Sequence, residues 1–411
     1  MIQNEREYLR KLAYRCRDIA SLPIMEERKR RWKLHNSCKN DRPMVVMEMQ
    51  TFEHELIPAL RCETDLAKRI EHQLLRQMIR HEKIDDDAVM PDFFDVPMDI
   101  DIESFQIEKK RRYCYDKAGN QLGYADEHFI VDIEEDFLKL KNSEVRVNTK
   151  ATMQYAEYAS DVIGDILPIV IKNHSLEWFL GISQRIIELM GMEALMFAMY
   201  DSPETVKQLY RFVCDDTIGV LRRQEELGLL TANNGNDFAG AGSFGFADEL
   251  KTDEKITTKM LWGNLNSQET VGVSPAMYGE FAFEEYRRLA QEFGLVYYGC
   301  CEPVHDLWEP YIRHIPGLRK VSVSPWCDEE RMGTVLKGSN VIYSRKPSPN
   351  YIGVGRDLDE DAYTKHIEKT LRAATGCTLE IIHRDIYTLD GNPSKVKRAI
   401  ELSRAAIERI W

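Results

Sequence analysis

Three apolar runs in the second half of the chain each end in a cluster of polar side chains. The runs are Lys259 to Leu265, Leu295 to Cys300 and Lys320 to Ser324, and helical patterns separate them. Strands that alternate with helices favour a parallel sheet built from βα units. In a (β/α)8 barrel, the reactive groups lie where the strands run into the following loops. The sequence therefore predicts that chemistry takes place after these three strands.

The rest of the chain fits the same architecture. We predict one TIM-type (β/α)8 barrel over residues 41–411, preceded by a helical extension over residues 1–40, because no internal repeat or low-complexity linker divides the chain. Further strands are expected at Met44 to Met49, residues 88–94, Leu167 to Ile171, Asn340 to Ser344 and residues 378–386. Helices are expected at Asn4 to Ala20, Ile24 to His35, Asp65 to Ile79, residues 203–226, Asp306 to His314, Glu360 to Ala374 and Ser394 to Trp411.

Two segments stand out from the alternating pattern. Residues 99–149 are highly charged and are expected to form an insertion over the mouth of the barrel, with a hairpin turn at K-A-G-N, residues 117–120. The loop G-A-G-S-F-G, Gly240 to Gly245, has the glycine spacing of a dinucleotide fingerprint. That fingerprint must turn directly from a strand into a helix, whereas these glycines lie in a long mid-chain loop. We therefore expect a mobile cover over the site and no nucleotide.

Composition excludes several classes of partner. The 411 residues carry a formal net charge of −13, which disfavours nucleic acid, since its binders present basic surfaces. The nine cysteines are an odd number and scattered, so we expect a reducing cytoplasm and not a disulfide framework. No apolar stretch is long enough for a signal core or a membrane span. A soluble cytoplasmic enzyme is the expectation.

Longer motifs resemble a known family. The segment L-N-S-Q-E-T-V-G-V-S-P-A-M-Y-G-E-F, a following strand that ends in a cysteine, and the shorter P-E-T-V-K-Q-L-Y and G-C-T-L-E-I resemble the uroporphyrinogen decarboxylase-like superfamily. The resemblance covers roughly Asp41 to the end and implies a TIM-type barrel. Members are either decarboxylases or zinc-dependent, corrinoid-linked methyltransferases. The R-Q-A-G-R-Y type motif of the decarboxylases has no match in this chain.

The spacing of three residues resembles the methyltransferase branch. Glu269, Glu284 and His305 fit the pattern E-x14-E-x20-H, which is similar to the zinc motif of ether-cleaving methyltransferases. Thiol-alkylating relatives use H-x-C instead, and Cys300 occupies the cysteine position while Tyr298 replaces the histidine. The resemblance thus implies zinc, and it leaves the ligand set open between Glu/Glu/His and a set that contains cysteine. The candidate ligands are Glu269, Glu284, Cys300, Cys301 and His305, of which Glu269 and His305 are also the candidate catalytic residues.

The implied function is removal of a methyl group from a small methylated substrate. Zinc would act as a Lewis acid on the leaving oxygen of a methoxylated aromatic, and the Co(I) corrinoid of a partner protein would accept the methyl group. Candidate substrate-binding residues are Asp237, Phe238, Phe244, Asn266, Gln268, Tyr298, Trp326 and Arg345. The donor atom, whether oxygen, nitrogen or sulfur, and the existence of a homodimer stay open.

Each candidate also has a purely structural interpretation. Glu284 fits a solvated helix face, and Cys300 and Cys301, as neighbours in an extended segment, are expected to point to opposite faces. A metal-free lyase similar to uroporphyrinogen decarboxylase, using Arg345, Arg384 and Asp385, is the alternative enzyme. An inactive barrel that serves as a binding module is a third class.

Overall fold

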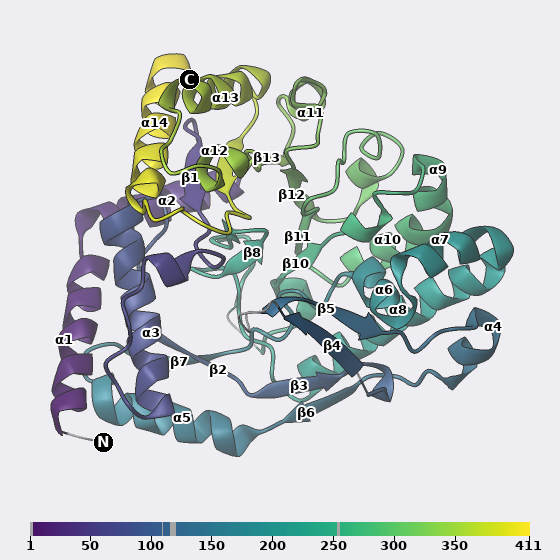
Figure 1. Cartoon of the computed structure of the whole chain (residues 1–411), viewed down its shortest axis with the longest axis horizontal. Coiled ribbons are helices and arrows are strands. Elements are labelled where there is room, and N and C mark those ends of the chain that lie inside the picture. The colour runs from purple at the N-terminus through teal and green to yellow at the C-terminus, as the bar shows by residue number, and fades with distance from the viewer. Residues whose placement is uncertain (1–2, 109, 116–120, 253–254) are drawn as a thin grey trace.

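A six-stranded parallel sheet forms the centre of the computed structural model, which describes residues 3–108, 110–115, 121–252 and 255–411 (Figure 1). The strand order is β10-β11-β12-β13-β14-β1. The strands are β1 (Met44–Met47), β10 (Trp262–Leu265), β11 (Leu295–Tyr298), β12 (Leu318–Val323), β13 (Ile342–Arg345) and β14 (Leu379–His383). A second parallel pair joins β2 (Phe94–Pro97) to β7 (Ile169–Lys172). The predicted α/β class with a parallel sheet is confirmed.

Side-chain hydrogen bonds bridge the breaks between the two sheets. The Asp87 carboxylate accepts from the Val45 N–H at 2.8 Å, and the Asp87 N–H donates to the Val45 carbonyl, which ties β1 to the segment before β2. On the other side, Asn233 exchanges two hydrogen bonds with the backbone of Trp262 on β10. The Asn173 N–H, directly after β7, donates to Thr231. Both edges of the six-stranded sheet are thus connected to the β2–β7 pair.

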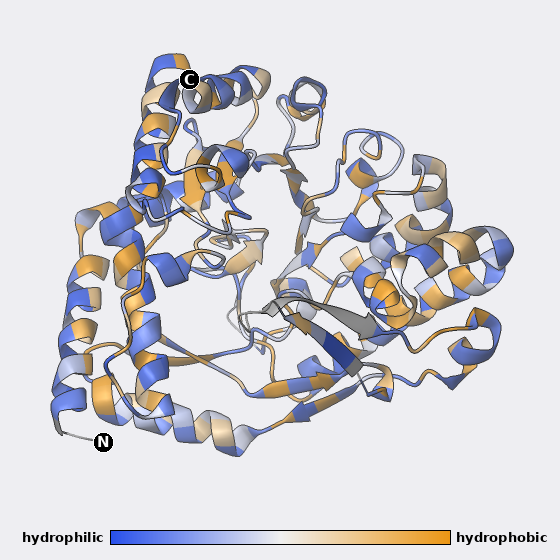
Figure 2. Ribbon diagram, viewed as in Figure 1, coloured by the Kyte–Doolittle hydropathy of each residue, from blue (hydrophilic) through white to orange (hydrophobic). Residues whose placement is uncertain are grey.

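Helices lie around the sheets, and most of them carry hydrophobic and hydrophilic residues in alternating bands along their length (Figure 2). In the last helix the buried Val396, Ile400 and Ile407 recur at helical spacing. The long helices are α1 (Gln3–Ala20), α2 (Pro23–Asn36), α3 (Asp65–Ile79), α5 (Thr149–Ile163), α6 (Ile182–Met190), α7 (Met192–Asp201), α8 (Pro203–Glu226), α10 (Glu284–Ala290), α11 (Glu329–Leu336), α13 (Glu360–Ala373) and α14 (Ser394–Ile410). Among the described residues, no helix has both the length and the apolar composition that crossing a membrane requires.

One predicted helix does not form. Residues 306–314 fold into turns that end in a single 3-10 turn, Ile312–His314. Pro310 lies in the middle of this segment, where it lacks the N–H that a helix needs and clashes with the preceding turn. The other predicted helices are confirmed within one or two residues of their expected ends.

The charged insertion consists of antiparallel ribbons. β3 (Ile100–Glu103) pairs with β6 (Glu144–Val147), and β4 (Lys110–Tyr115) pairs with β5 (Gln121–Glu127). Ser143 hydrogen-bonds through its N–H and its hydroxyl to Asp216 on α8, and Arg185 on α6 donates to the same hydroxyl. These contacts fix the base of the insertion to α6 and α8. The predicted turn at residues 117–120 lies outside the described residues.

The glycine-rich loop is a buried hairpin and not a mobile cover, so that prediction was wrong. Its strands are β8 (Phe238–Gly240) and β9 (Ser243–Phe244), and Ala239, Ala241 and Ser243 are almost fully buried. A Cβ on Gly240 would lie 2.4 Å from Cγ of Tyr297 on β11, and one on Gly242 would lie 2.8 Å from Ile382 on β14. The glycines therefore permit close approach to the sheet.

The contacts of this hairpin show that the sheet is strongly curved. β10 and β14 are four strands apart, a separation of about 19 Å in a flat sheet. Gly240 and Gly242 are at most about 7 Å apart along the chain. Yet the nearest neighbours of Gly240 include Asn264 on β10, while Gly242 approaches Ile382 on β14. The sheet therefore curls around the hairpin, which fills part of its inner face.

Replacing Gly240 by Ala should lower the midpoint of urea unfolding. The added methyl group meets the rigid ring base of Tyr297, and such overpacking costs about 1–3 kcal/mol. The matched control is Gly219→Ala within α8, where a Cβ meets nothing within 4 Å and the helix should gain up to about 1 kcal/mol. Equal unfolding midpoints for the two variants would show that the hairpin does not pack against β11 as described.

Candidate functional site

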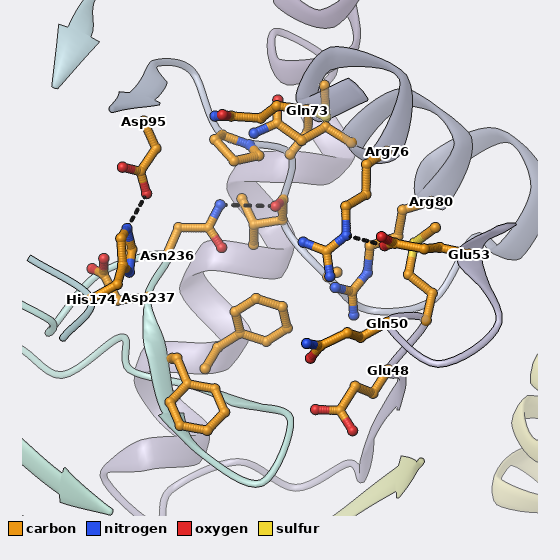
Figure 3. Close-up of a pocket in the computed structure, with 18 of the residues that line it drawn as sticks. Glu48, Gln50, Glu53, Gln73, Arg76, Arg80, Asp95, His174, Asn236 and Asp237 are labelled. Atoms are coloured by element: carbon orange, nitrogen blue, oxygen red, sulfur yellow. Dashed lines mark hydrogen bonds and ion pairs between the residues drawn. The ribbon is translucent and has the colours of Figure 1, made fainter. Parts of the chain in front are cut away.

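A cavity of about 860 Å³ lies beyond the carboxyl ends of β1 and β7 and alongside β2 (Figure 3). Its walls are α3, the segments that follow β1 and β7, residues 86–97 and the hairpin β8–β9. Glu48 enters it directly after β1, and His174 enters it after β7. Phe93, Phe238 and Phe244 supply apolar surface. The size and the mixed lining are typical of small-molecule sites.

The wall formed by α3 is cationic. Lys68, Arg69, His72 and Arg76 all line the cavity. Arg76 pairs with Glu53 at 2.6 Å, and His72 approaches the same carboxylate at 3.4 Å. Neither Lys68 nor Arg69 has a carboxylate partner among the described residues, although the Arg69 guanidinium lies 3.9 Å from the centroid of the Tyr155 ring. This wall therefore carries an excess of positive charge.

Around His174, beside β2 and β7, carboxylates outnumber the cations. His174 contacts Asp95 through Nε2 at 2.8 Å (Figure 3). Its Nδ1 contacts Glu177 at 2.5 Å. Burial opposes protonation of the imidazole, but the hydrogen bonds with both carboxylates raise the pKa of His174 to about 10. His174 is thus an imidazolium at neutral pH, flanked by two carboxylates. Lys172 and Asp237 form a neighbouring ion pair.

A second cluster adjoins the cavity through Glu48. Nε of Arg384, which follows β14, lies 3.2 Å from Oε2 of Glu48, and its Nη1 lies 3.6 Å from Sγ of Cys300. The Sγ atoms of Cys300 and Cys301 are 3.6 Å apart, and Cys301 Sγ is 3.7 Å from Asp385. The hydrogen bond from Cys300 lowers the pKa of the Cys301 thiol, despite its burial. The cluster is a pair of thiols between a guanidinium and a carboxylate.

The two cysteines do not point to opposite faces as expected. β11 ends at Tyr298, and Gly299 then turns the chain with a φ of +97°, so the alternation of a strand no longer applies. Glu302 holds this turn, because its carboxylate accepts from the N–H groups of Ser267 and Cys300 at 2.9 and 2.8 Å. Burial raises the pKa of Glu302.

Behind the cluster lies a buried lysine. Lys346, directly after β13, donates to the Tyr297 hydroxyl and to the Ser344 hydroxyl, each at 2.6 Å. Burial lowers the pKa of Lys346 to about 7. Lys346 therefore changes charge near neutral pH, next to Arg384 and Cys300.

Three of the predicted substrate-binding residues line the cavity, namely Asp237, Phe238 and Phe244. Two others face the helices instead. The Tyr298 hydroxyl bonds to the Tyr278 hydroxyl at 2.7 Å, and Arg345 pairs with Glu329 on α11 at 2.8 Å. Side chains alternate along a strand, so the inward positions are the neighbouring Tyr297 and Ser344.

The remaining predicted contacts lie away from the cavity. Asn266 is buried, and its carbonyl accepts from the Tyr286 hydroxyl. Gln268 lies in a 3-10 turn, Gln268–Thr270. Trp326 is 74% exposed on the loop after β12. None of these three lines the 860 Å³ cavity.

The predicted zinc ligands are not assembled into one coordination shell. Glu269 accepts from the Ser183 hydroxyl at 2.6 Å, whereas Glu284 is half-exposed on α10 and pairs with Arg287. His305 accepts from the Asp328 N–H at 3.4 Å. Within the described ranges, no group of three or more His, Cys, Asp or Glu is placed to hold a metal ion. Glu269, Glu284 and His305 would therefore have to move together before they could hold a zinc ion.

The sequence analysis did not identify the charged side chains that line the cavity. Lys68, Arg69, His72 and Arg76 recur on one side of a helix that was predicted correctly, but a charged helix face is usually solvated. His174 follows a strand and could have been found by the rule that found His305.

Comparison with known proteins gives a likeness of fold. No family model matches the chain, and no curated protein matches it. The structure is similar to a solved structure described as a methyltransferase from Methanosarcina mazei, with a TM-score of 0.50 and 10% sequence identity, over 93% of this chain and 98% of that one. At this identity, the likeness concerns the fold alone.

Lys346→Met should change how stability depends on pH. Between pH 7 and 10 the unfolded chain holds a proton on this lysine that the folded protein has released, so the wild type gains stability as pH rises. Methionine has no group that titrates in this range. Urea unfolding at pH 6.5, 8 and 9.5 should therefore show that the free energy of unfolding of the wild type rises, relative to that of the variant, by on the order of a few kcal/mol. A difference that does not vary with pH would contradict the lowered pKa.

Proposed function

We propose that the chain is an enzyme that transfers a methyl group from a small methylated donor, a methoxylated aromatic in the first instance, to the Co(I) corrinoid of a partner protein. The observation that carries the proposal is the cavity at the carboxyl ends of the strands, which joins apolar rings to charged groups beside the Cys300–Cys301–Arg384 cluster. The methyltransferase whose fold this chain resembles supports the same class of reaction.

The proposed framework is a closed (β/α)8 barrel of the uroporphyrinogen decarboxylase-like type. Its eight strands would be β1, β2, β7, β10, β11, β12, β13 and β14. The curvature around the β8–β9 hairpin and the side-chain bridges at both sheet breaks support closure. In such a barrel the reacting groups belong at the carboxyl ends of the strands.

The side chains around the cavity can perform the steps that an ether donor requires. Phe93, Phe238 and Phe244 would hold an aromatic ring and exclude water. When the cobalt takes the methyl group, the ether oxygen keeps the bonding electron pair and becomes a phenoxide. The Arg384 guanidinium, fixed by Glu48 at 3.2 Å, places positive charge at the edge of the cavity, where it would stabilise this phenoxide.

A metal-free lyase similar to uroporphyrinogen decarboxylase is the second candidate. Lys68 and Arg69 favour it, because they line the cavity without a carboxylate partner among the described residues and a decarboxylase must bind substrate carboxylates. Of its predicted residues, Arg384 and Asp385 lie in the cluster, while Arg345 faces α11. Release of carbon dioxide without any corrinoid would identify this activity.

The methyl-transfer assay uses the intact chain, a reduced corrinoid protein and a panel of methoxylated aromatics. Methyl transfer should remove the Co(I) absorbance, and Arg384→Gln should slow it about 10²-fold, since one cation at the leaving oxygen is lost. Lys397→Gln, at an exposed position of α14, is the matched control and should keep full activity. Inactivity of the wild type on every donor, with a corrinoid protein that is competent with another methyltransferase, would refute the function.

Zinc remains a separate prediction. Purified protein should contain about one zinc per chain, as a catalytic site with three protein ligands implies. Elemental analysis of the wild type and of His305→Ala tests this, and the variant should lose most of the metal while its circular dichroism spectrum is unchanged. A metal-free wild type with full methyl transfer would remove zinc from the proposal without removing the activity.

A further inference from the structure

We infer that Cys300 and Cys301 are a modification site, at which a hydroperoxide joins the two neighbouring thiols in a disulfide that other thiols readily reverse. The inference is independent of the proposed function, because it concerns the two sulfur atoms and no methyl donor. It stands on the distance between these atoms, on the turn that brings them together and on their unequal exposure.

The backbone holds both sulfur atoms on the same side of the chain. Neighbouring side chains in an extended strand point to opposite faces, but Gly299, directly after β11, has a φ of +97°. The Cys300 N–H donates to the Glu302 carboxylate at 2.8 Å, and the Cys300 carbonyl accepts from the Ser322 hydroxyl at 2.7 Å. Both backbone polar groups of Cys300 are thus fixed, and the two Sγ atoms lie 3.6 Å apart.

The two thiols differ in exposure. Cys301 is partly exposed, whereas Cys300 is only 5% exposed. A small peroxide therefore reaches the Cys301 sulfur first, while the Cys300 thiol is protected from separate oxidation. A redox-sensitive cysteine pair needs this difference, because the second thiol must capture the first product before that product is oxidised further.

Two displacement steps close the disulfide. The Cys301 sulfur attacks one oxygen of the hydroperoxide, the O–O bond breaks, and the leaving oxygen takes up the thiol proton and departs as water or an alcohol. The Cys300 sulfur then attacks the sulfur of the sulfenic acid, the S–O bond breaks, and the leaving hydroxide takes the Cys300 proton to form water. The cysteines lose two electrons and two protons in total, and the peroxide accepts both electrons.

The adjacent positions of the two cysteines make this disulfide easy to reduce. Neighbouring Cα atoms are about 3.8 Å apart, which is less than the roughly 4.4–6.8 Å that ordinary disulfides span. The disulfide is therefore strained, and strained disulfides are reduced more readily than structural ones. We expect reduced glutathione to restore both thiols, so the modification is a reversible state of the protein.

Closure changes the surroundings of Arg384. The Cys301 thiol donates to the Asp385 carboxylate at 3.7 Å, and a disulfide has no S–H group that could do so. The Asp385 carboxylate lies 3.4 Å from Nε of Arg384, so after losing this hydrogen bond it competes with Glu48 for the guanidinium. Oxidation of the pair thereby affects Glu48, which lines the cavity.

Peptide mapping of the intact chain tests the inference. The protein is treated with a chelator, because a metal ion on the sulfur atoms would protect them, then with hydrogen peroxide, and free thiols are alkylated after unfolding. Trypsin cuts after lysine and arginine, so the tryptic peptide over residues 289–313 contains Cys300, Cys301 and no other cysteine. Most of this peptide should escape alkylation and should be lighter by two hydrogen atoms. Reduced glutathione should restore both alkylation sites.

Variants separate closure of the pair from general oxidation. In Cys300→Ser the reaction should stop at a sulfenic acid on Cys301, which dimedone traps, because the neighbouring thiol is gone. Cys114→Ser, which removes the exposed thiol of β4, is the matched control and should form the disulfide like the wild type. Cys16, which has no exposed surface, should stay reduced during the treatment and thereby shows that the fold is intact.

Three results would overturn the inference. The first is a 289–313 peptide that keeps both thiols while the exposed Cys114 is oxidised. The second is a disulfide that links this peptide to another part of the chain. The third is the addition of several oxygen atoms to Cys301 while Cys300 stays a thiol, which would mean that the two sulfur atoms do not meet.

Discussion

A single buried carboxylate, Glu380 on β14, holds the centre of the molecule together. It accepts from Lys320 on β12, Ser344 on β13, Ser243 of the hairpin and His35 of α2, at 2.5 to 3.1 Å. Burial disfavours its charge, yet Lys320 and His35 hold its pKa well below the usual range. Removing one partner of such a buried group typically costs 3–5 kcal/mol, because an uncompensated charge remains. The N-terminal helices and the hairpin are therefore integral to the sheet.

This arrangement determines where a ligand can bind. Because the β8–β9 hairpin occupies the inner face of the curved sheet, the large space lies to one side, between α3, β2 and the ends of β1 and β7. The groups that charge this space belong to segments more than one hundred residues apart, as Lys68 and His174 illustrate. Only the folded chain brings these charged side chains to one cavity.

The sequence predicted the elements well and the side-chain directions less well. Hydrophobic periodicity located α3, α8 and α14, because packing of one helix face leaves a direct trace in the sequence. Arg345 and Tyr298 were assigned to the wrong face, since a shift of one residue reverses every side chain of a strand. The glycine-rich loop was wrongly predicted to be mobile for another reason. Glycine permits both mobility and close packing, so the sequence alone does not tell which of them applies. The structure does, because Tyr297 packs directly against Gly240.

Glu48 links the cavity to the thiol cluster. It lines the cavity directly after β1 and also pairs with Arg384, whose guanidinium contacts the Cys300 thiol. A charged group that enters the cavity near Glu48 would compete with Arg384 for this carboxylate, because both interactions use the same two oxygen atoms. Occupancy of the cavity and the charge beside Cys300 are thereby coupled through one ion pair.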